Sequence, residues 1–350
     1  MRRNSQEENK EENKFKDKSA DKSIDLMLRP SSWGEYIGQK KIKSGLKIII
    51  EAAGKREEAI DHLLFYGQPG LGKTTLAILV AKETRGNFKM VSAPNLSKSG
   101  DLIALLSNLE ERDVLFIDEA HRLHPAVEEV FYSAIDNRKI NFMVGKGPAS
   151  RMLSLDLPSF TLIAATTRVN LVSAPLRSRF GAIFQIDYYE NNDIEAIIER
   201  SAEILGVKID KDATRMIVRA SRFTPRLANR ILKRARDIAE VKNSKIITKI
   251  IDRQVVLGTF DLLGIDELGL EIHDRKLLET IIKKFRGGPV GISALAAALG
   301  EERGAIEEVY EPYLMKINFL QRTPGGRTAT IEARDWLDAA LYKINPSLYN

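Results

Sequence analysis

The sequence predicts an α/β fold in which a parallel-sheet P-loop domain is followed by a helical lid domain and a C-terminal winged-helix domain. Three observations support this fold class. An apolar run over 62–66 leads into a glycine loop over 67–74 and then into an apolar helical run, which is the strand, loop and helix order of a P-loop sheet. From residue 192 onward the apolar spacing is helical. Residues 261–350 read as three helices followed by a hairpin around 324–326.

Composition indicates a globular protein of two or three domains. The chain has 350 residues, of which 43% are hydrophobic and 29% charged, and a net charge of +6. We expect a cytoplasmic protein with no membrane partner, because no apolar run is long enough to cross a bilayer and no signal-peptide pattern follows the start. The lack of cysteine excludes disulfides, thiolate catalysis and cysteine-based zinc sites. The mild basic excess permits a nucleic-acid partner without demonstrating one.

Pattern changes divide the chain into four segments. Residues 1–23 are highly charged and nearly free of large apolar side chains, so they predict a disordered tail. Residues 24–186 are the predicted large ATPase domain, 187–260 the helical lid and 261–350 the winged-helix head. Within the large domain the expected strands are 87–91, 114–117, 160–167 and 183–186, and the expected helix is 101–109. The later expected helices are 194–205, 213–221, 225–241, 248–257, 274–285, 293–300 (capped by Ser293) and 302–316.

The glycine loop predicts a nucleoside-triphosphate site. Residues 67–74 read GQPGLGKT and fit G-x-x-x-x-G-K-[ST] at every fixed position. The glycines let backbone N–H groups converge on phosphate oxygens at a helix N-terminus. Lys73 is then expected to reach the β- and γ-phosphates and the Thr74 hydroxyl to ligate Mg²⁺. The alternative is a glycine-rich turn without a ligand, and the complete strand, loop and helix context favours the phosphate site.

Two acids complete this prediction. The four apolar residues 114–117 precede Asp118 and Glu119 and indicate a strand buried on both faces of a parallel sheet. Ligands bind at the carboxyl ends of such strands. Asp118 is therefore predicted to hold the Mg²⁺ shell, and Glu119 to orient and deprotonate the attacking water. By itself this motif is better explained as a strand that merely ends in acids, but its pairing with the glycine loop favours the catalytic interpretation.

Other segments leave alternatives open. Apolar runs around 145–149 predict a protruding hairpin over 140–157, whose apolar residues either pack on the domain or form a partner-binding patch. Arg177 and Arg179 precede a strand and become candidates for a finger toward a neighbouring subunit only if the protein is an ATPase. Arg226 opens a helix whose predicted cap is Thr224, which directs it toward the sheet domain.

The predicted wing carries two arginines. Arg322 and Arg327 lie on opposite sides of the turn at 324–326, where they could contact DNA phosphates. A winged helix can also be a protein-docking module, and the acidic balance of residues 261–350 weakly favours that alternative.

With these residues assembled, the chain resembles the bacterial RuvB family, the ATP-driven motor subunits that move Holliday junctions during recombinational repair. The resemblance runs from Leu28 to the C-terminus. Its ordered set of segments identifies a much smaller group of proteins than a phosphate loop alone. The segments are LRP at 28–30, the phosphate loop, DEAHRL at 118–123, GKGPA at 145–149, ATTR at 165–168, APLRSRFG at 174–181, GGPVG at 287–291, GEER at 300–303 and LQRTP at 320–324.

The resemblance implies an AAA+ ATPase that uses ATP and Mg²⁺ and encircles double-stranded DNA at Holliday junctions as a homohexamer. It adds Thr167 as first sensor and Arg179 as trans-acting finger to the catalytic residues Lys73, Asp118 and Glu119. The hairpin 140–157 matches the element that docks on RuvA, and the RuvC resolvase is an indirect partner. The implied nucleotide-binding residues are Leu28, Arg29, Gly70, Gly72, Lys73, Thr74, Thr75, Arg177, Tyr189 and Arg226, the last as second sensor, and the implied DNA-binding residues are Arg322 and Arg327.

The chain departs from the family pattern at a few positions. Gln68 replaces a usual Pro, Ala120 an Ile, and Phe223 a Gly; these changes are compatible with the fold. The residues Asp136-Asn137-Arg138 stand where the family typically has two acids and an aromatic, which leaves a nucleotide contact there open.

Two rival functions fit parts of the pattern. A winged-helix AAA+ replication initiator or helicase loader would use ATP as a switch. A clamp-loader-like adaptor would grip a protein partner, but the lack of cysteine and the predicted wing count against it.

Overall fold

The computed structural model describes residues 24–144, 151–242 and 250–344. The predicted tail 1–23 and the segment 145–149 lie outside these residues. The chain divides into two compact units, the first comprising residues up to Gly206 together with Phe223–Asn229, and the second comprising Val207–Arg222 together with residues from Arg230 onward. The domain boundaries at 23, 186 and 260 stay a prediction.

The first unit is built on a five-stranded parallel sheet, in the order β2-β3-β6-β1-β7. The apolar central strands β3 and β6 are buried, and burial on both faces was predicted for β3. Because β6 lies between β1 and β3, the segments that follow these strands meet at one edge of the sheet. The strands are β1 Leu63–Tyr66, β2 Phe88–Ser92, β3 Val114–Asp118, β6 Thr161–Thr166 and β7 Ala182–Gln185.

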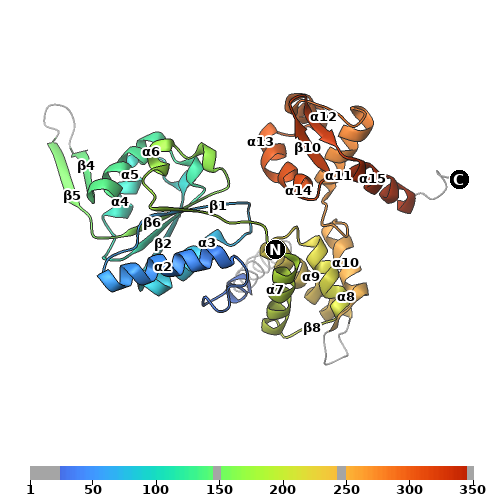
Figure 1. Cartoon of the computed structure of the whole chain (residues 1–350), viewed down its shortest axis with the longest axis horizontal. Helices are drawn as coiled ribbons and strands as arrows, with labels where there is room; N and C mark the ends of the chain where they lie inside the picture. Colours follow the sequence, from blue (N-terminus) through green and yellow to red (C-terminus); the bar gives the residue numbers. More distant parts are fainter. Residues whose placement is uncertain (1–23, 145–150, 243–249, 345–350) are drawn as a thin grey trace, which may run out of the picture. The chain divides into compact units, whose positions relative to one another are not determined.

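Helices cover both faces of this sheet (Figure 1). On one face α2 and α3 pack together, and the α2 backbone at Gly45 lies against Phe184 of β7. On the other face Leu64, Leu115 and Leu162 share a core with residues of α4, α5 and α6. The elements are α2 Lys40–Arg56, α3 Lys73–Thr84, α4 Ser99–Leu106, α5 Pro125–Asn137 and α6 Ala174–Arg177, with the short helices η1 Ala93–Asn95, η2 Ala120–Arg122 and η4 Val169–Leu171.

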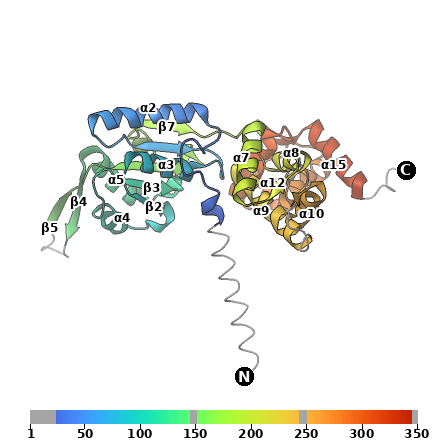
Figure 2. The ribbon, with the colours of Figure 1, turned by 90° about the horizontal axis from the view of Figure 1, so that it is seen from below.

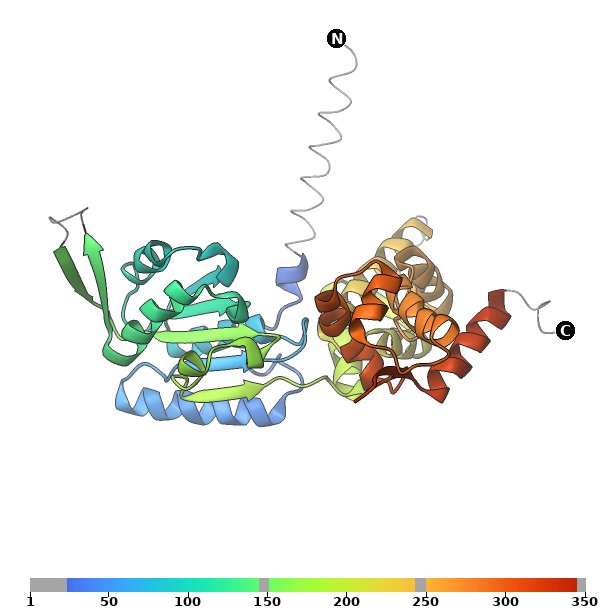
Figure 3. The same cartoon turned by 90° about the horizontal axis from the view of Figure 1, so that it is seen from above.

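A hairpin projects from this domain in every view (Figures 1, 2 and 3). It pairs β4 Lys139–Val144 with β5 Arg151–Asp156 in antiparallel register. Met143, Met152 and Leu153 are exposed on it, whereas Ile140 at its base is buried. The predicted hairpin is therefore confirmed, and its outer apolar residues do not pack on the domain.

The helices after the sheet follow the predicted order with one correction. The helix predicted over 248–257 begins only at Arg253, where the Asp252 side chain accepts a hydrogen bond from the Val255 N–H at 2.9 Å. Ile250 and Ile251 instead form a short strand, because they pair in parallel with Lys208–Ile209. The elements are α7 Asn191–Ile204, β8 Lys208–Ile209, α8 Lys211–Ala220, α9 Pro225–Lys242, β9 Ile250–Ile251 and α10 Arg253–Leu263.

The C-terminal part of the second unit has the predicted helices and two-stranded wing. Ser293 is not the cap of its helix, which begins at Ile292 after Gly291 and has no side-chain cap bond. The final helix α15 was not predicted. The elements are α11 Ile272–Glu279, η5 Thr280–Lys284, α12 Ile292–Leu299, α13 Arg303–Ala305, η6 Ile306–Tyr310, α14 Glu311–Lys316, β10 Leu320–Thr323, β11 Gly326–Ala329 and α15 Ile331–Ile344. Among the described residues, no helix is long and apolar enough to cross a membrane.

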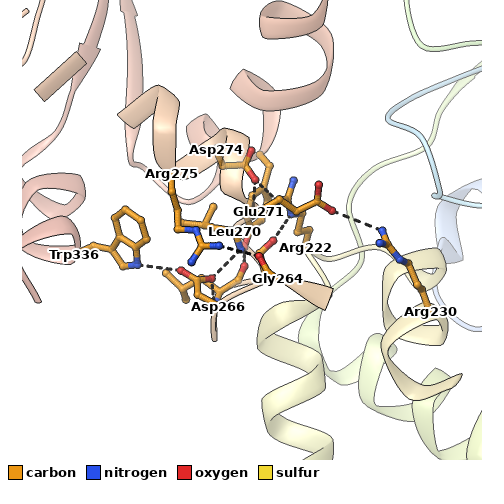
Figure 4. Close-up of polar contacts among 12 residues, drawn as sticks. Arg222, Arg230, Gly264, Asp266, Leu270, Glu271, Asp274, Arg275 and Trp336 are labelled. Atoms are coloured by element: carbon orange, nitrogen blue, oxygen red, sulfur yellow. Dashed lines mark hydrogen bonds and ion pairs between the residues drawn. The ribbon is translucent and has the colours of Figure 1, made fainter. Parts of the chain in front are cut away.

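Arg222, which follows α8, fixes that helix to the winged helix inside the second unit (Figure 4). Its guanidinium pairs with the buried carboxylate of Asp274 in α11, and its Nε donates to the Gly269 carbonyl at 2.8 Å. It also lies 4.8 Å from the centre of the Tyr313 ring. Burial raises the pKa of Asp274 despite this partner, so the carboxylate depends on Arg222 to remain charged.

We expect Arg222→Ala to lower the free energy of unfolding by about 3–5 kcal/mol, because it leaves the Asp274 carboxylate buried and unpaired. Denaturant unfolding measures this loss. The matched control is Arg215→Ala, which removes an exposed pair with Asp212 and should cost at most about 1 kcal/mol. Equal losses in the two variants would contradict a stabilising role of the buried pair.

Candidate nucleotide-binding site

The glycine loop between β1 and α3 is fixed to its surroundings by the backbone. The Gly67 N–H donates to the Thr166 carbonyl of β6 at 3.2 Å. Gly67 has φ 151°, and a Cβ there would lie 2.3 Å from the Ile186 carbonyl oxygen. Gly70 has φ 82°, and a Cβ there would lie 2.9 Å from the Cβ of Arg226. Both positions therefore require glycine for a positive φ and a close approach.

Lys73 is held beneath this loop. Its Nζ donates to the Gly67 and Gln68 carbonyls at 2.7 and 2.9 Å. Burial lowers its pKa to about 8, and the nearby Asp118 carboxylate opposes that shift. The structure thus brings together the lysine of the loop and the acid at the end of β3.

We expect ATP affinity to fall as pH rises through about 8. The free protein loses the Lys73 proton above its pKa of about 8. Bound phosphate favours the charged lysine, so binding must restore that proton. The affinity for ATP should therefore fall by up to about tenfold per pH unit above this pKa. Nucleotide titrations between about pH 7.5 and 9.5 measure the effect. Lys73→Arg is the control, because a guanidinium keeps its charge over this range and should give a flat profile. The same slope in both proteins would contradict the assignment.

Asp118 and Glu119 lie where β3 ends. The Glu119 N–H donates to Asp118 Oδ1 at 2.9 Å. Glu119 has φ 54° and ψ 40°, a left-handed conformation that costs a non-glycine residue about 1–3 kcal/mol. This turn leads directly into η2, and the Glu119 carboxylate accepts a hydrogen bond from Arg122 at 3.1 Å. Strain of this kind is common where a side chain must be presented at a functional site.

Two threonines lie at the end of β6, Thr166 as its last residue and Thr167 directly after it. Thr166 is buried, and its Oγ1 lies 2.9 Å from His121 Nδ1 and accepts from the Arg168 N–H at 2.9 Å. Thr167 follows it and is partly exposed. The Thr166–His121 contact was not predicted, and it links the end of β6 to the segment that carries Glu119.

A second group of residues surrounds the start of α3. The Tyr189 hydroxyl lies 3.1 Å from the Tyr36 hydroxyl and 3.3 Å from the Leu71 carbonyl oxygen, and burial raises the pKa of Tyr189 to about 12. A Cβ on Gly72 would lie 3.0 Å from the Tyr36 hydroxyl and 3.6 Å from that of Tyr189. The structure therefore places Tyr189 beside the loop, together with Tyr36, which the sequence analysis missed.

The N-terminal arm is anchored to α7. Leu28 is buried, and its carbonyl accepts from Arg200 at 3.0 Å, while Arg200 also pairs with Glu35 at 2.6 Å. Arg29 is exposed. No local sequence signal identifies Arg200 as the anchor, because its partners lie far away in the chain.

The candidate arginines fall into two groups. Arg226 opens α9, and its side-chain carbons lie against Gly70 of the loop. Arg177 ends α6 and donates to the Val169 carbonyl at 3.4 Å. Arg179 is bound to Asp136 of α5, with Arg179 Nη2 2.7 Å from Asp136 Oδ2. Only Arg226 of these three contacts the glycine loop of its own chain in the described structure.

The oxygen donors suit a magnesium ion that is bound together with phosphate. The described ranges contain no cluster of three or more His, Cys, Asp or Glu side chains able to hold a metal alone. Mg²⁺ in nucleotide sites is typically held by one or two protein oxygens plus phosphate oxygens and water. Asp118 at the strand end and Thr74, with its neighbour Thr75, in the first turn of α3 supply such oxygens.

The wing arginines have partners within the second unit. Arg322 and Arg327 lie opposite each other on β10 and β11, and both pair with the buried carboxylate of Glu311 in α14, at 2.5 and 2.7 Å. Arg327 also pairs with Glu307 at 2.8 Å. The Arg327 side chain is 13% exposed, whereas that of Arg322 is 47% exposed. Arg322 is thus the more accessible of the two.

Comparisons with known proteins match nearly the whole described chain. Three family models match it in order: Holliday junction DNA helicase RuvB P-loop domain at 28–186, RuvB AAA lid domain at 189–266 and RuvB C-terminal winged helix domain at 267–338. A relative from Fusobacterium nucleatum subsp. nucleatum, named Holliday junction branch migration complex subunit RuvB, is 51% identical over 306 residues, which covers 87% of this chain and 91% of that protein.

Solved structures agree. The Thermotoga maritima RuvB Holliday junction branch migration motor is 47% identical with a TM-score of 0.80, over 89% of this chain and 98% of that one. A mutant of the same protein is also 47% identical, with a TM-score of 0.81 and the same coverage.

Proposed function

Because the chain belongs to the RuvB family of AAA+ ATPases, we propose that it is the ATP-driven motor of a Holliday junction branch-migration complex. The observation that carries this proposal is the meeting of the glycine loop, Asp118, Glu119 and the end of β6 at one edge of the sheet. The family relationship does not favour the alternative of a replication initiator or helicase loader that uses ATP as a switch.

The proposed roles follow from this geometry. Lys73 leaves the loop carbonyls to contact the β- and γ-phosphates, which the backbone N–H groups of the loop surround. Thr74 and Asp118 would hold Mg²⁺, which would neutralise charge that develops on the phosphates. Glu119 orients the attacking water and takes its proton. Thr167 and Arg226 act as first and second sensors, since one follows β6 and the other lies against the loop.

We assign partner contacts to the hairpin β4–β5, the winged helix and Arg179. The exposed apolar residues of the hairpin β4–β5 are proposed to dock on RuvA, and the winged helix to contact double-stranded DNA. Six subunits form the ring, and Arg179 of each reaches the nucleotide of its neighbour. RuvC is an indirect partner at the junction, and a motor on chromosomal DNA places the protein in the bacterial cytoplasm.

ATPase assays with and without random duplex DNA and RuvA test the proposal. A motor should hydrolyse ATP faster when duplex DNA of any sequence is present, and RuvA with a synthetic four-way junction should allow strand separation. Slow hydrolysis that responds only to one preferred sequence would instead support the initiator. Branch migration without added ATP would overturn the motor mechanism.

The wing gives a prediction that separates its two arginines. Arg322→Ala should weaken binding to all duplexes alike and lower the log–log salt slope by about one, because each neutralised phosphate releases counterions. Both changes remove a partner of the buried Glu311, and Arg327→Ala should reduce the stability of the head more, because it also removes the partner of Glu307. Together the two changes should lower the slope by about two.

Titration of several unrelated duplexes at several salt concentrations measures this effect, and thermal unfolding of each variant controls for folding. Basal ATPase activity should hardly change, because neither wing arginine is among the residues proposed to bind the nucleotide. A loss confined to one DNA sequence would contradict phosphate contact by the wing.

A further inference from the structure

One face of α5 holds the side chain of Arg179. Glu128, Tyr132 and Asp136 are spaced four residues apart on α5, so they lie in one row along the helix. Tyr132 and Asp136 both contact Arg179. The sequence analysis left a nucleotide contact at Asp136 open, and the structure gives this residue a specific partner.

Asp136 binds one edge of the guanidinium. Arg179 Nε and Nη2 donate to the same oxygen, Asp136 Oδ2, at 2.9 and 2.7 Å. Arg179 Nη1 donates to the Pro175 carbonyl at 2.7 Å. A guanidinium has five N–H donors, so with these described contacts one donor on Nη1 and one on Nη2 remain for another ligand. The Arg179 side chain is 25% exposed, so it is not fully enclosed by these contacts.

Tyr132 supports the face of the same guanidinium. The Arg179 Cζ lies 4.5 Å from the centre of the Tyr132 ring, a cation–π distance. The Tyr132 hydroxyl donates to Glu128 at 2.9 Å and lies 3.1 Å from Ser173 Oγ. Ser173 in turn caps α6, since its Oγ accepts from the Leu176 N–H at 3.3 Å. The ring and the Asp136 carboxylate therefore fix the guanidinium from two directions.

We propose that Asp136 is a positioning residue that fixes Arg179 in the orientation in which its free N–H groups reach the γ-phosphate of a nucleotide bound to the adjacent subunit. The inference rests on the proposed function, in which Arg179 is the trans-acting finger. A misplacement of about 1 Å in such a group can cost about 10²-fold in rate. The pair itself is partly exposed and contributes little to the stability of the fold, so its removal should change activity rather than stability.

Other roles for Asp136 predict different effects on ATPase activity. If Asp136 were a latch that withholds Arg179 from the neighbouring site, its removal would raise ATPase activity. If Asp136 instead contacted the neighbouring nucleotide directly, its loss would add to the loss of Arg179. A double-mutant cycle distinguishes these cases, because a residue that acts only through Arg179 has no effect once Arg179 is absent.

The test compares the ATPase activity of full-length Asp136→Ala, Asp136→Glu, Arg179→Ala and the Asp136→Ala/Arg179→Ala double variant, with thermal unfolding and MgATP binding measured on each. Asp136→Ala should lose about 10- to 100-fold in kcat with KM within about twofold, because only the finger is displaced. Asp136→Glu retains the carboxylate and should restore most of the activity. The double variant should be no slower than Arg179→Ala.

Glu129→Ala is the matched control, because Glu129 is an exposed carboxylate on α5 and no contact of its side chain with Arg179 is seen in the described structure. Activity of Asp136→Ala equal to that control, higher than wild type, or additive with the loss of Arg179 would overturn the inference. If Arg179→Ala is itself fully active, the finger in the proposed function fails, and the inference fails with it. If only Arg179→Ala is impaired, the finger stands and the positioning role of Asp136 is wrong.

Discussion

Glu119→Gln should bind MgATP as the wild type does and hydrolyse it about 10²- to 10⁴-fold more slowly. The glutamine keeps the size of the side chain and an oxygen that can still accept from Arg122, so the left-handed turn at Glu119 need not change. What it loses is the carboxylate that we propose takes the proton of the attacking water. Lys73 and Asp118 remain, so the phosphates and the metal can still bind. Single-turnover hydrolysis and a nucleotide-binding titration on the same preparation measure the two effects separately.

Glu129→Gln is the control for this experiment, since it changes an exposed carboxylate to the same amide without touching the candidate site. It should retain wild-type turnover. Near-normal hydrolysis in Glu119→Gln would show that Glu119 is not the base. Loss of MgATP binding in Glu119→Gln would show that the residue acts in the ground state, and the strained turn would then need another explanation.

The central parts of the site were predictable because each is encoded locally. The glycine spacing of 67–74 predicts a loop at the start of a helix, and the apolar run 114–117 predicts a buried strand that ends at two acids. The rule that ligands bind at the carboxyl ends of parallel strands then joins them. The observed order, with β6 between β1 and β3, confirms that these segments meet at one edge.

The parts that sequence analysis missed depend on contacts between distant residues. Tyr36 stands in a turn-rich arm with nothing to mark it, yet it meets Tyr189 from a segment 153 positions away. Ile250 and Ile251 are apolar residues that would suit a helix as well as a strand. Their conformation depends on the pairing with β8, which the local sequence does not show. The Asp136–Arg179 pair also joins separate elements, and no local pattern predicts it.

Arg179→Ala should fold and bind ATP but hydrolyse it about 10³-fold or more slowly, which is the order of effect of other arginine fingers. Arg179 is bound to Asp136 and Pro175, and within the described ranges no hydrogen bond joins it to the glycine loop of its own chain. This placement is consistent with the proposed role of Arg179 at a site on another subunit. We therefore expect that the activity lost in an Arg179→Ala subunit can be restored by a neighbouring subunit that carries an intact Arg179.

Mixed rings of Arg179→Ala and Lys73→Ala subunits test this expectation. Lys73→Ala loses its own site but keeps Arg179, so where it adjoins an Arg179→Ala subunit it should complete that subunit's intact site. Turnover should rise as Lys73→Ala protein is added to a fixed amount of Arg179→Ala protein, whereas Lys73→Ala/Arg179→Ala double-variant subunits should restore nothing. Native mass spectrometry shows whether mixed oligomers form. Mixed oligomers without any restored turnover would contradict a finger that acts between subunits, because a working loop and a working arginine would then be present in one ring without completing a site.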